Sequence, residues 1–128
     1  MSKTAFYILL LVCTTMNTCL FADVKNRGEE QALIVNLRWS PQDDVRRIHQ
    51  LEEKLAAAIA QSSAGEFDGD EFGKDTCTLY MYGPSAQRLF EVTIRLLRDF
   101  HASAGSYLLK RFGKPGARQE RVELSSSK

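Results

Sequence analysis

The most unusual stretch of the chain is an acidic run between residues 66 and 75. Its five carboxylates are Glu66, Asp68, Asp70, Glu71 and Asp75. In an extended conformation, Glu66, Asp68 and Asp70 would project to one side of the strand. Three converging carboxylates are a ligand set for a hard divalent cation such as Ca²⁺. The run therefore indicates either a cation site or an acidic surface that contacts a partner.

The spacing of these acids also imitates the first ligands of an EF-hand loop. That loop requires Gly at the position of Glu71 and a bidentate Glu at the position of Cys77. The flanking segments moreover predict strands and not helices, so an EF-hand is excluded. The structural alternative to a cation site is a solvated hairpin whose charges deter edge-to-edge pairing.

Residues suited to acid–base or nucleophilic chemistry are few and scattered. His49 and His101 both lie on predicted helices, where structural roles explain them; an imidazolium suits the helix end at His101. Cys77 alternates with Leu79 in a predicted strand, which is typical of a small buried residue. No nucleophile elbow, zinc-protease, P-loop or Cys-Xaa-Xaa-Cys pattern occurs. We predict that the protein is not an enzyme and has no cofactor and no metal; the alternative is a divalent-cation-binding domain or metal-dependent enzyme built on Glu66–Glu71.

A second candidate surface comes from strand residues that point away from the predicted core. Thr78, Tyr80 and Tyr82 would form a row beside Arg38, and a flat row of Tyr and Thr is a suitable contact surface for a partner. The alternative is that the row binds no partner and that Tyr and Thr occupy the solvent-exposed face of an antiparallel sheet because of their β-propensity. The predicted partner-binding residues are Glu66, Asp68, Asp70, Glu71, Thr78, Tyr80, Tyr82 and Arg38.

Composition excludes several classes of protein. Of the 128 residues, 44% are hydrophobic, and 17 Lys and Arg balance 16 Asp and Glu. This balance lacks the basic excess that nucleic acid requires, so we predict no nucleic-acid partner. The hydrophobic content is that of an ordinary globular domain.

The elements that must position these residues follow from hydrophobic periodicity. Ser40 and Pro41 supply an N-cap hydroxyl and a first-turn proline, so they predict that the first helix starts there. The predicted elements are a strand over Gln31–Trp39, a helix from Ser40 to Ser62, strands over Gly65–Asp75 and Thr76–Tyr82, a helix over Ala86–Phe100, and a hairpin of Ser106–Phe112 and Arg118–Leu124.

This order, with a right-handed crossover, predicts an α+β fold of the ferredoxin-like split β-α-β-β-α-β type. An extra C-terminal hairpin strand extends the antiparallel sheet, and both helices lie on one face. A rearranged α+β sandwich is the alternative. The single domain is expected over residues 31–124, with a flexible segment at 23–30 and a disordered tail at 125–128.

The first 22 residues have the layout of a secretory signal peptide. Lys3 precedes the apolar run Ala5–Cys13, and small Ala22 stands at the expected cleavage site. The alternatives are a membrane anchor formed by residues 5–22 and lipidation at Cys19 or Cys13. Cleavage would leave Cys77 without an internal disulfide partner. We therefore expect an exported protein, periplasmic or secreted, that does not contact the membrane once the leader is removed.

Three segments resemble a small family of uncharacterised bacterial α+β proteins: Gly65–Glu71, Thr78–Pro84 and Arg111–Ala117. The resemblance covers about residues 33 to 124 and implies one compact domain of ferredoxin-like type, with no established activity. Taken together, the sequence predicts a small exported non-catalytic binding module. It would act as an inhibitor or immunity-like protein through an open sheet face and an acidic hairpin. Its partner would be another envelope protein or a second copy.

Overall fold

The computed structural model describes residues 30–125. The leader predicted over residues 1–22, almost all of the segment 23–30 and residues 126–128 of the predicted tail lie outside this range. In chain order, the described part forms β1 (Gln31–Arg38), α2 (Val45–Ser62), β2 (Glu66–Phe72), β3 (Thr76–Gly83), α3 (Ala86–Asp99), β4 (Tyr107–Arg111) and β5 (Gln119–Glu123).

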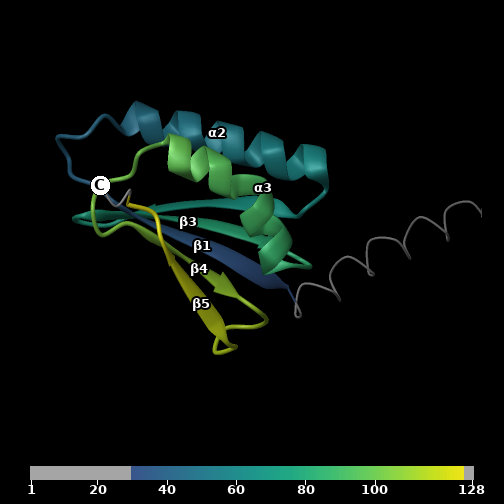
Figure 1. Ribbon diagram of the computed structural model, residues 1–128. Helices are drawn as coiled ribbons and strands as arrows, with labels where there is room; N and C mark the ends of the chain where they lie inside the picture. The colour runs from purple at the N-terminus through teal and green to yellow at the C-terminus, as the bar shows by residue number, and fades with distance from the viewer. Residues whose placement is uncertain (1–29, 126–128) are drawn as a thin grey trace, which may run out of the picture.

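The strands form one sheet in the order β2-β3-β1-β4-β5, and every neighbouring pair is antiparallel. Both helices lie on the same side of this sheet, which leaves its other face open (Figure 1). The predicted α+β fold is confirmed, and the order is consistent with the ferredoxin-like split arrangement. The extra strand is β5, which pairs with the outer edge of β4.

The core lies between the sheet and the two helices. In β1 the alternate residues Leu33, Val35 and Leu37 are buried, and Val35 stands opposite Leu79 of β3. Cys77 is buried in the core, as its alternation predicted, and burial raises the pKa of its thiol to about 12, which favours the protonated form.

Helix α2 packs on the sheet through a regular stripe of buried residues at spacings of three and four: Ile48, Leu51, Leu55 and Ile59. Its start differs from the prediction. The N-cap is Asp44, whose carboxylate accepts a hydrogen bond from the Arg46 amide at 3.0 Å. Ser40 instead opens a turn, since its carbonyl accepts from the Asp43 amide at 2.9 Å and its amide donates to the Asp43 carboxylate at 2.7 Å.

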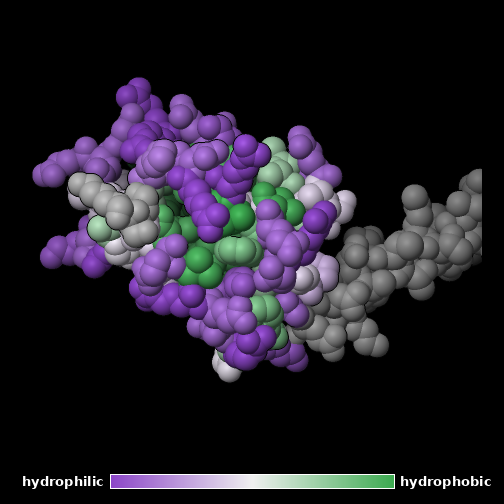
Figure 2. Space-filling view, in the orientation of Figure 1, coloured by the Kyte–Doolittle hydropathy of each residue, from purple (hydrophilic) through white to green (hydrophobic). Residues whose placement is uncertain are grey.

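Helix α3 begins as predicted, after the break at Pro84. Ser85 is its N-cap and accepts a hydrogen bond from the Arg88 amide at 3.1 Å. Polar residues cover the outer sides of both helices, and hydrophobic residues gather along the layer between helices and sheet (Figure 2). Over residues 30–125, no helix has the length and apolar character needed to cross a membrane.

Beneath α3, β4 carries a charged residue into the layer between sheet and helices. Lys110 is only 8% exposed, and its ammonium lies 2.9 Å from the Glu120 carboxylate and 3.0 Å from Gln87 Oε1. It also lies 4.7 Å from the centre of the Phe90 ring. The charge is therefore compensated, as burial of an ammonium requires.

Candidate functional site

The open face of the sheet is formed by alternate residues of all five strands. Register places its residues in rows that run across the sheet, because each one stands opposite an outward residue of the next strand. The middle of the face is half-buried and includes the hydrogen-bonded pair Asn36 and Thr78; its aromatic and aliphatic residues are Ile34, Tyr80, Tyr82, Tyr107 and Leu109. We call this set the central strip.

Acidic side chains lie on one side of the central strip. Glu66 and Glu71 of β2 stand opposite Tyr82 and Thr78 of β3, so both belong to the open face. Asp68 belongs to the same side, because it lines the same cavity as Glu66 and Tyr82.

Basic side chains lie on the other side of the central strip. Arg111 is on β4, Lys114 follows it in the turn, and Arg121 of β5 stands opposite Leu109. The Arg121 guanidinium lies 3.6 Å from the centre of the Tyr107 ring and pairs with Glu123. At about 4.8 Å between strands, the two charged sides are roughly 14 to 19 Å apart. This separation exceeds the screening length of about 8 Å at physiological salt, so the two charges do not cancel each other.

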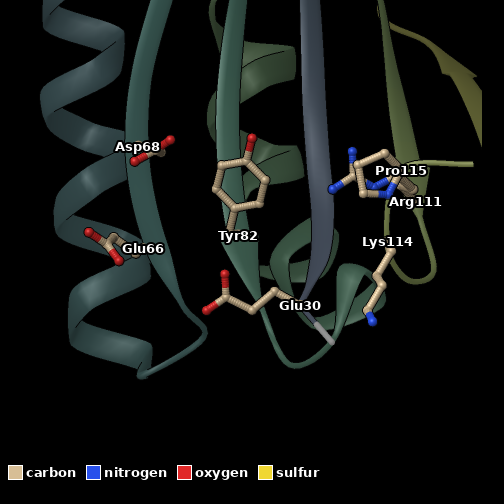
Figure 3. A pocket seen from close by; sticks show the side chains of 7 residues that line it. All are labelled: Glu30, Glu66, Asp68, Tyr82, Arg111, Lys114 and Pro115. Atoms are coloured by element: carbon tan, nitrogen blue, oxygen red, sulfur yellow. The ribbon is translucent and has the colours of Figure 1, made fainter. Parts of the chain in front are cut away.

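Both charges border one shallow cavity of about 490 Å³ at the end of the face (Figure 3). In the figure, Glu66 and Asp68 lie on one side, Arg111 and Lys114 on the other, and Tyr82 between them. The lining residues are Glu30, Glu66, Asp68, Tyr82, Arg111, Lys114 and Pro115.

Seven of the eight predicted partner-binding residues lie on the open face: Glu66, Asp68, Glu71, Thr78, Tyr80, Tyr82 and Arg38. The Tyr80 hydroxyl donates to the Glu71 carboxylate at 2.9 Å, and this bond raises the pKa of Tyr80. Arg38 lies at the far end of the face, where it pairs with Asp75 at 3.3 Å.

Asp70 is the exception, and the prediction that it projects with Glu66 and Asp68 is wrong. A β-bulge interrupts β2 between Phe67, which faces Met81, and Gly69, which faces Tyr80. The bulge inserts one residue and reverses the alternation beyond it. Asp70 therefore stands opposite buried Leu79, on the helix side of the sheet, and the three carboxylates do not converge.

On the helix side, Asp70 meets two residues of α2. His49 Nδ1 lies 3.0 Å from Glu52 Oε2, and one ligand atom each from His49, Glu52 and Asp70 lie within 4.8 Å of one another. Sequence reasoning assigned His49 a structural role and missed this cluster. Two signals were present: the i,i+3 spacing of His49 and Glu52, and a glycine inside a strand at Gly69, which often marks a bulge.

Comparison of the chain with protein-family models, with curated proteins and with solved structures finds no match. The family resemblance therefore stays a prediction, and the two candidate sites are the open face and the cluster of His49, Glu52 and Asp70.

Proposed function

We propose that the protein is a non-catalytic binding module that acts through the open face of its sheet, and that its partner is a second copy of the chain. The observation that supports this proposal is the separation of charge across the face. Glu66, Asp68 and Glu71 lie on one side of the central strip, and Arg111 and Lys114 lie on the other, where Arg121 is already paired with Glu123.

A face of this kind is complementary to itself. When two copies stack face to face about a twofold axis parallel to the strands, β2 of each copy lies over the β4–β5 side of the other. The acidic side of each copy then faces the basic side of the other, which gives two equivalent contacts, and the two central strips cover each other. A twofold axis across the strands would instead place β2 over β2, which like charges oppose. We expect a weak dimer that dissociates in about the micromolar range.

An inhibitor-like role through the acidic hairpin has less support. That interpretation needs the carboxylates to act together on a cationic cleft, but the bulge turns Asp70 to the opposite face from Glu66 and Glu71. The open face also presents bases, and these would repel a cationic partner.

Self-association is tested by charge reversal at two exposed positions, one on each side. Neither Glu66 nor Lys114 is held by an ion pair among the described residues, so Glu66→Lys and Lys114→Glu should leave the fold intact. Each single variant should weaken the dimer about tenfold, since both contacts become repulsive. Sedimentation velocity over a concentration series is the measurement, on protein purified in the form that the cell produces.

The double variant provides the decisive comparison. Glu66→Lys combined with Lys114→Glu restores opposite charges at both contacts, so dimerisation should recover. An equimolar mixture of the two single variants should recover partly, through a heterodimer. Arg95→Glu on the outer surface of α3 is the matched control and should change nothing. A monomer at every concentration, or a double variant weaker than both single ones, would contradict the proposal.

We further propose that this module is exported and works in the cell envelope, as the predicted leader implies. When the full chain is produced in a bacterium, the purified protein is expected to begin at Asp23. Intact-mass spectrometry measures this directly. A mass that retains Met1 would refute cleavage and favour the anchor over residues 5–22.

A further inference from the structure

The cluster of His49, Glu52 and Asp70 lies between α2 and β2, on the side of the sheet away from the open face. Its three ligand atoms lie within 4.8 Å of one another. His49 and Asp70 are exposed, whereas the Glu52 side chain is only 15% exposed. The cluster thus has a largely buried carboxylate at its base and two groups that solvent can reach.

Two independent features of the chain bring these groups together. The i,i+3 spacing on α2 places His49 and Glu52 on one surface of the helix. The β-bulge in β2 turns Asp70 toward that same helix, whereas a regular strand would turn it to the open face. Bulges often re-aim a side chain beside a functional site.

The buried carboxylate is incompletely satisfied. Glu52 Oε2 contacts His49 Nδ1 at 3.0 Å, but Oε1 is buried and has no hydrogen-bond partner. The Asp70 carboxylate lies beside that of Glu52, with one oxygen of each within 4.8 Å of the other, so two like charges face each other. A buried acceptor without a partner costs free energy, typically about 1 to 3 kcal/mol. A cation bound between the carboxylates would offset their repulsion, and coordination through both oxygens of Glu52 would also satisfy Oε1.

We propose that His49, Glu52 and Asp70 form a binding site for a divalent transition metal ion, with Zn²⁺ as the best fit. One imidazole and two carboxylates match Zn²⁺ chemistry, whereas Ca²⁺ and Mg²⁺ favour sets of oxygen ligands. Ligands of tetrahedral Zn²⁺ lie about 2.0 to 2.2 Å from the ion and therefore roughly 3.3 Å apart. The His49–Glu52 pair already has this spacing, and exposed Asp70 needs a side-chain rotation to reach it.

This site differs from the cation site that the acidic run alone suggested. It uses a histidine from α2 and one carboxylate of the run, and it leaves Glu66 and Asp68 on the opposite face. Phe72 borders it, with its ring centre 6.3 Å from that of His49. Three protein ligands leave a coordination position for water, since solvent reaches His49 and Asp70.

The test compares metal binding among variants of the full chain without a histidine tag. Cys13 and Cys19 of the predicted leader also offer thiolates wherever the leader is retained, so both are replaced by Ser in every protein compared. Isothermal titration with ZnCl₂ should give one site per chain in the parent protein. At a Zn²⁺ concentration 100 times the dissociation constant, the melting temperature should rise by roughly 10 °C or more. MgCl₂ should produce no shift.

His49→Ala and Asp70→Asn should each weaken Zn²⁺ binding at least about tenfold. Both positions are exposed, so these variants should fold. The matched controls are His101→Ala and Asp68→Asn, the second only two residues from Asp70 but on the opposite face. Controls that bind as the parent does, with both ligand variants impaired, would establish the site. Three results would overturn the proposal. They are an equal loss of Zn²⁺ affinity in Asp68→Asn and Asp70→Asn, an unchanged affinity in both ligand variants, and no Zn²⁺ binding by the parent protein.

Discussion

Replacement of Gly83 by alanine is expected to lower the free energy of unfolding by about 3 kcal/mol. Gly83 ends β3, where the connection from α2 to β2 passes across it. A Cβ at Gly83 would collide with the carbonyl oxygen of Ala64 and lie 3.2 Å from the Cα of Gly65. These are backbone atoms, which cannot rotate away as a side chain would, so α2 and β2 would have to separate from β3.

Thermal denaturation followed by circular dichroism measures this effect, as a fall of roughly 15 °C in melting temperature. Gly73→Ala is the matched control. A Cβ at Gly73 meets the side-chain oxygen of Thr76 at 3.1 Å, and a hydroxyl can turn aside. We expect the control to cost less than about 1 kcal/mol. If Gly83→Ala were as stable as the parent, the backbone of Ala64 and Gly65 would lie farther from Gly83 than the structure places it.

Much of this fold could be predicted because local pattern and global packing agree. The alternation of Leu33, Val35 and Leu37 predicts a half-buried strand, and the structure buries these residues against the helices. The helical stripe from Ile48 to Ile59 has the period of one buried face. Once the elements were known in order, the right-handed crossover rule left few sheet topologies to choose from.

The start of α2 could not be chosen from the sequence because two capping sequences compete. Ser40 followed by Pro41 and Asp44 followed by Val45 both suit a helix start. The hydrogen bonds between Ser40 and Asp43 stabilise a turn first, so the helix begins four residues later than Pro41 implies. Local propensity alone does not distinguish these two outcomes.

The candidate sites depend on the β-bulge in β2, which strand alternation does not predict. Counting by twos from Glu66 places Asp70 on the open face, and a single extra residue in the bulge reverses that result. The open face itself was predictable, since Thr78, Tyr80 and Tyr82 lie in the uninterrupted strand β3. Its basic side was not predicted, because which residues of β4 and β5 face outward depends on their register against β1.

A second large effect is expected at Leu79, the centre of β3. This residue is fully buried, stands opposite Val35 of β1 and belongs to the main core. Leu79→Ala removes apolar contacts and leaves a cavity in a closely packed layer, so we expect a loss of about 3 kcal/mol in the free energy of unfolding. Urea denaturation, which also reports whether the slope of the transition is unchanged, is the measurement.

The adjacent residue gives the matched comparison, because Tyr80 points to the other face of the same strand. Among residues 30–125 its hydroxyl bonds only to Glu71, on the surface, so Tyr80→Ala should cost about 1 kcal/mol in stability. The same change removes the middle of the central strip and should abolish the dimer measured by sedimentation. Leu79→Ala, studied where it is still folded, should dimerise as the parent does. If Tyr80→Ala were instead as destabilising as Leu79→Ala, the outward face would contribute to the core of the monomer, and its residues would not be available to a partner.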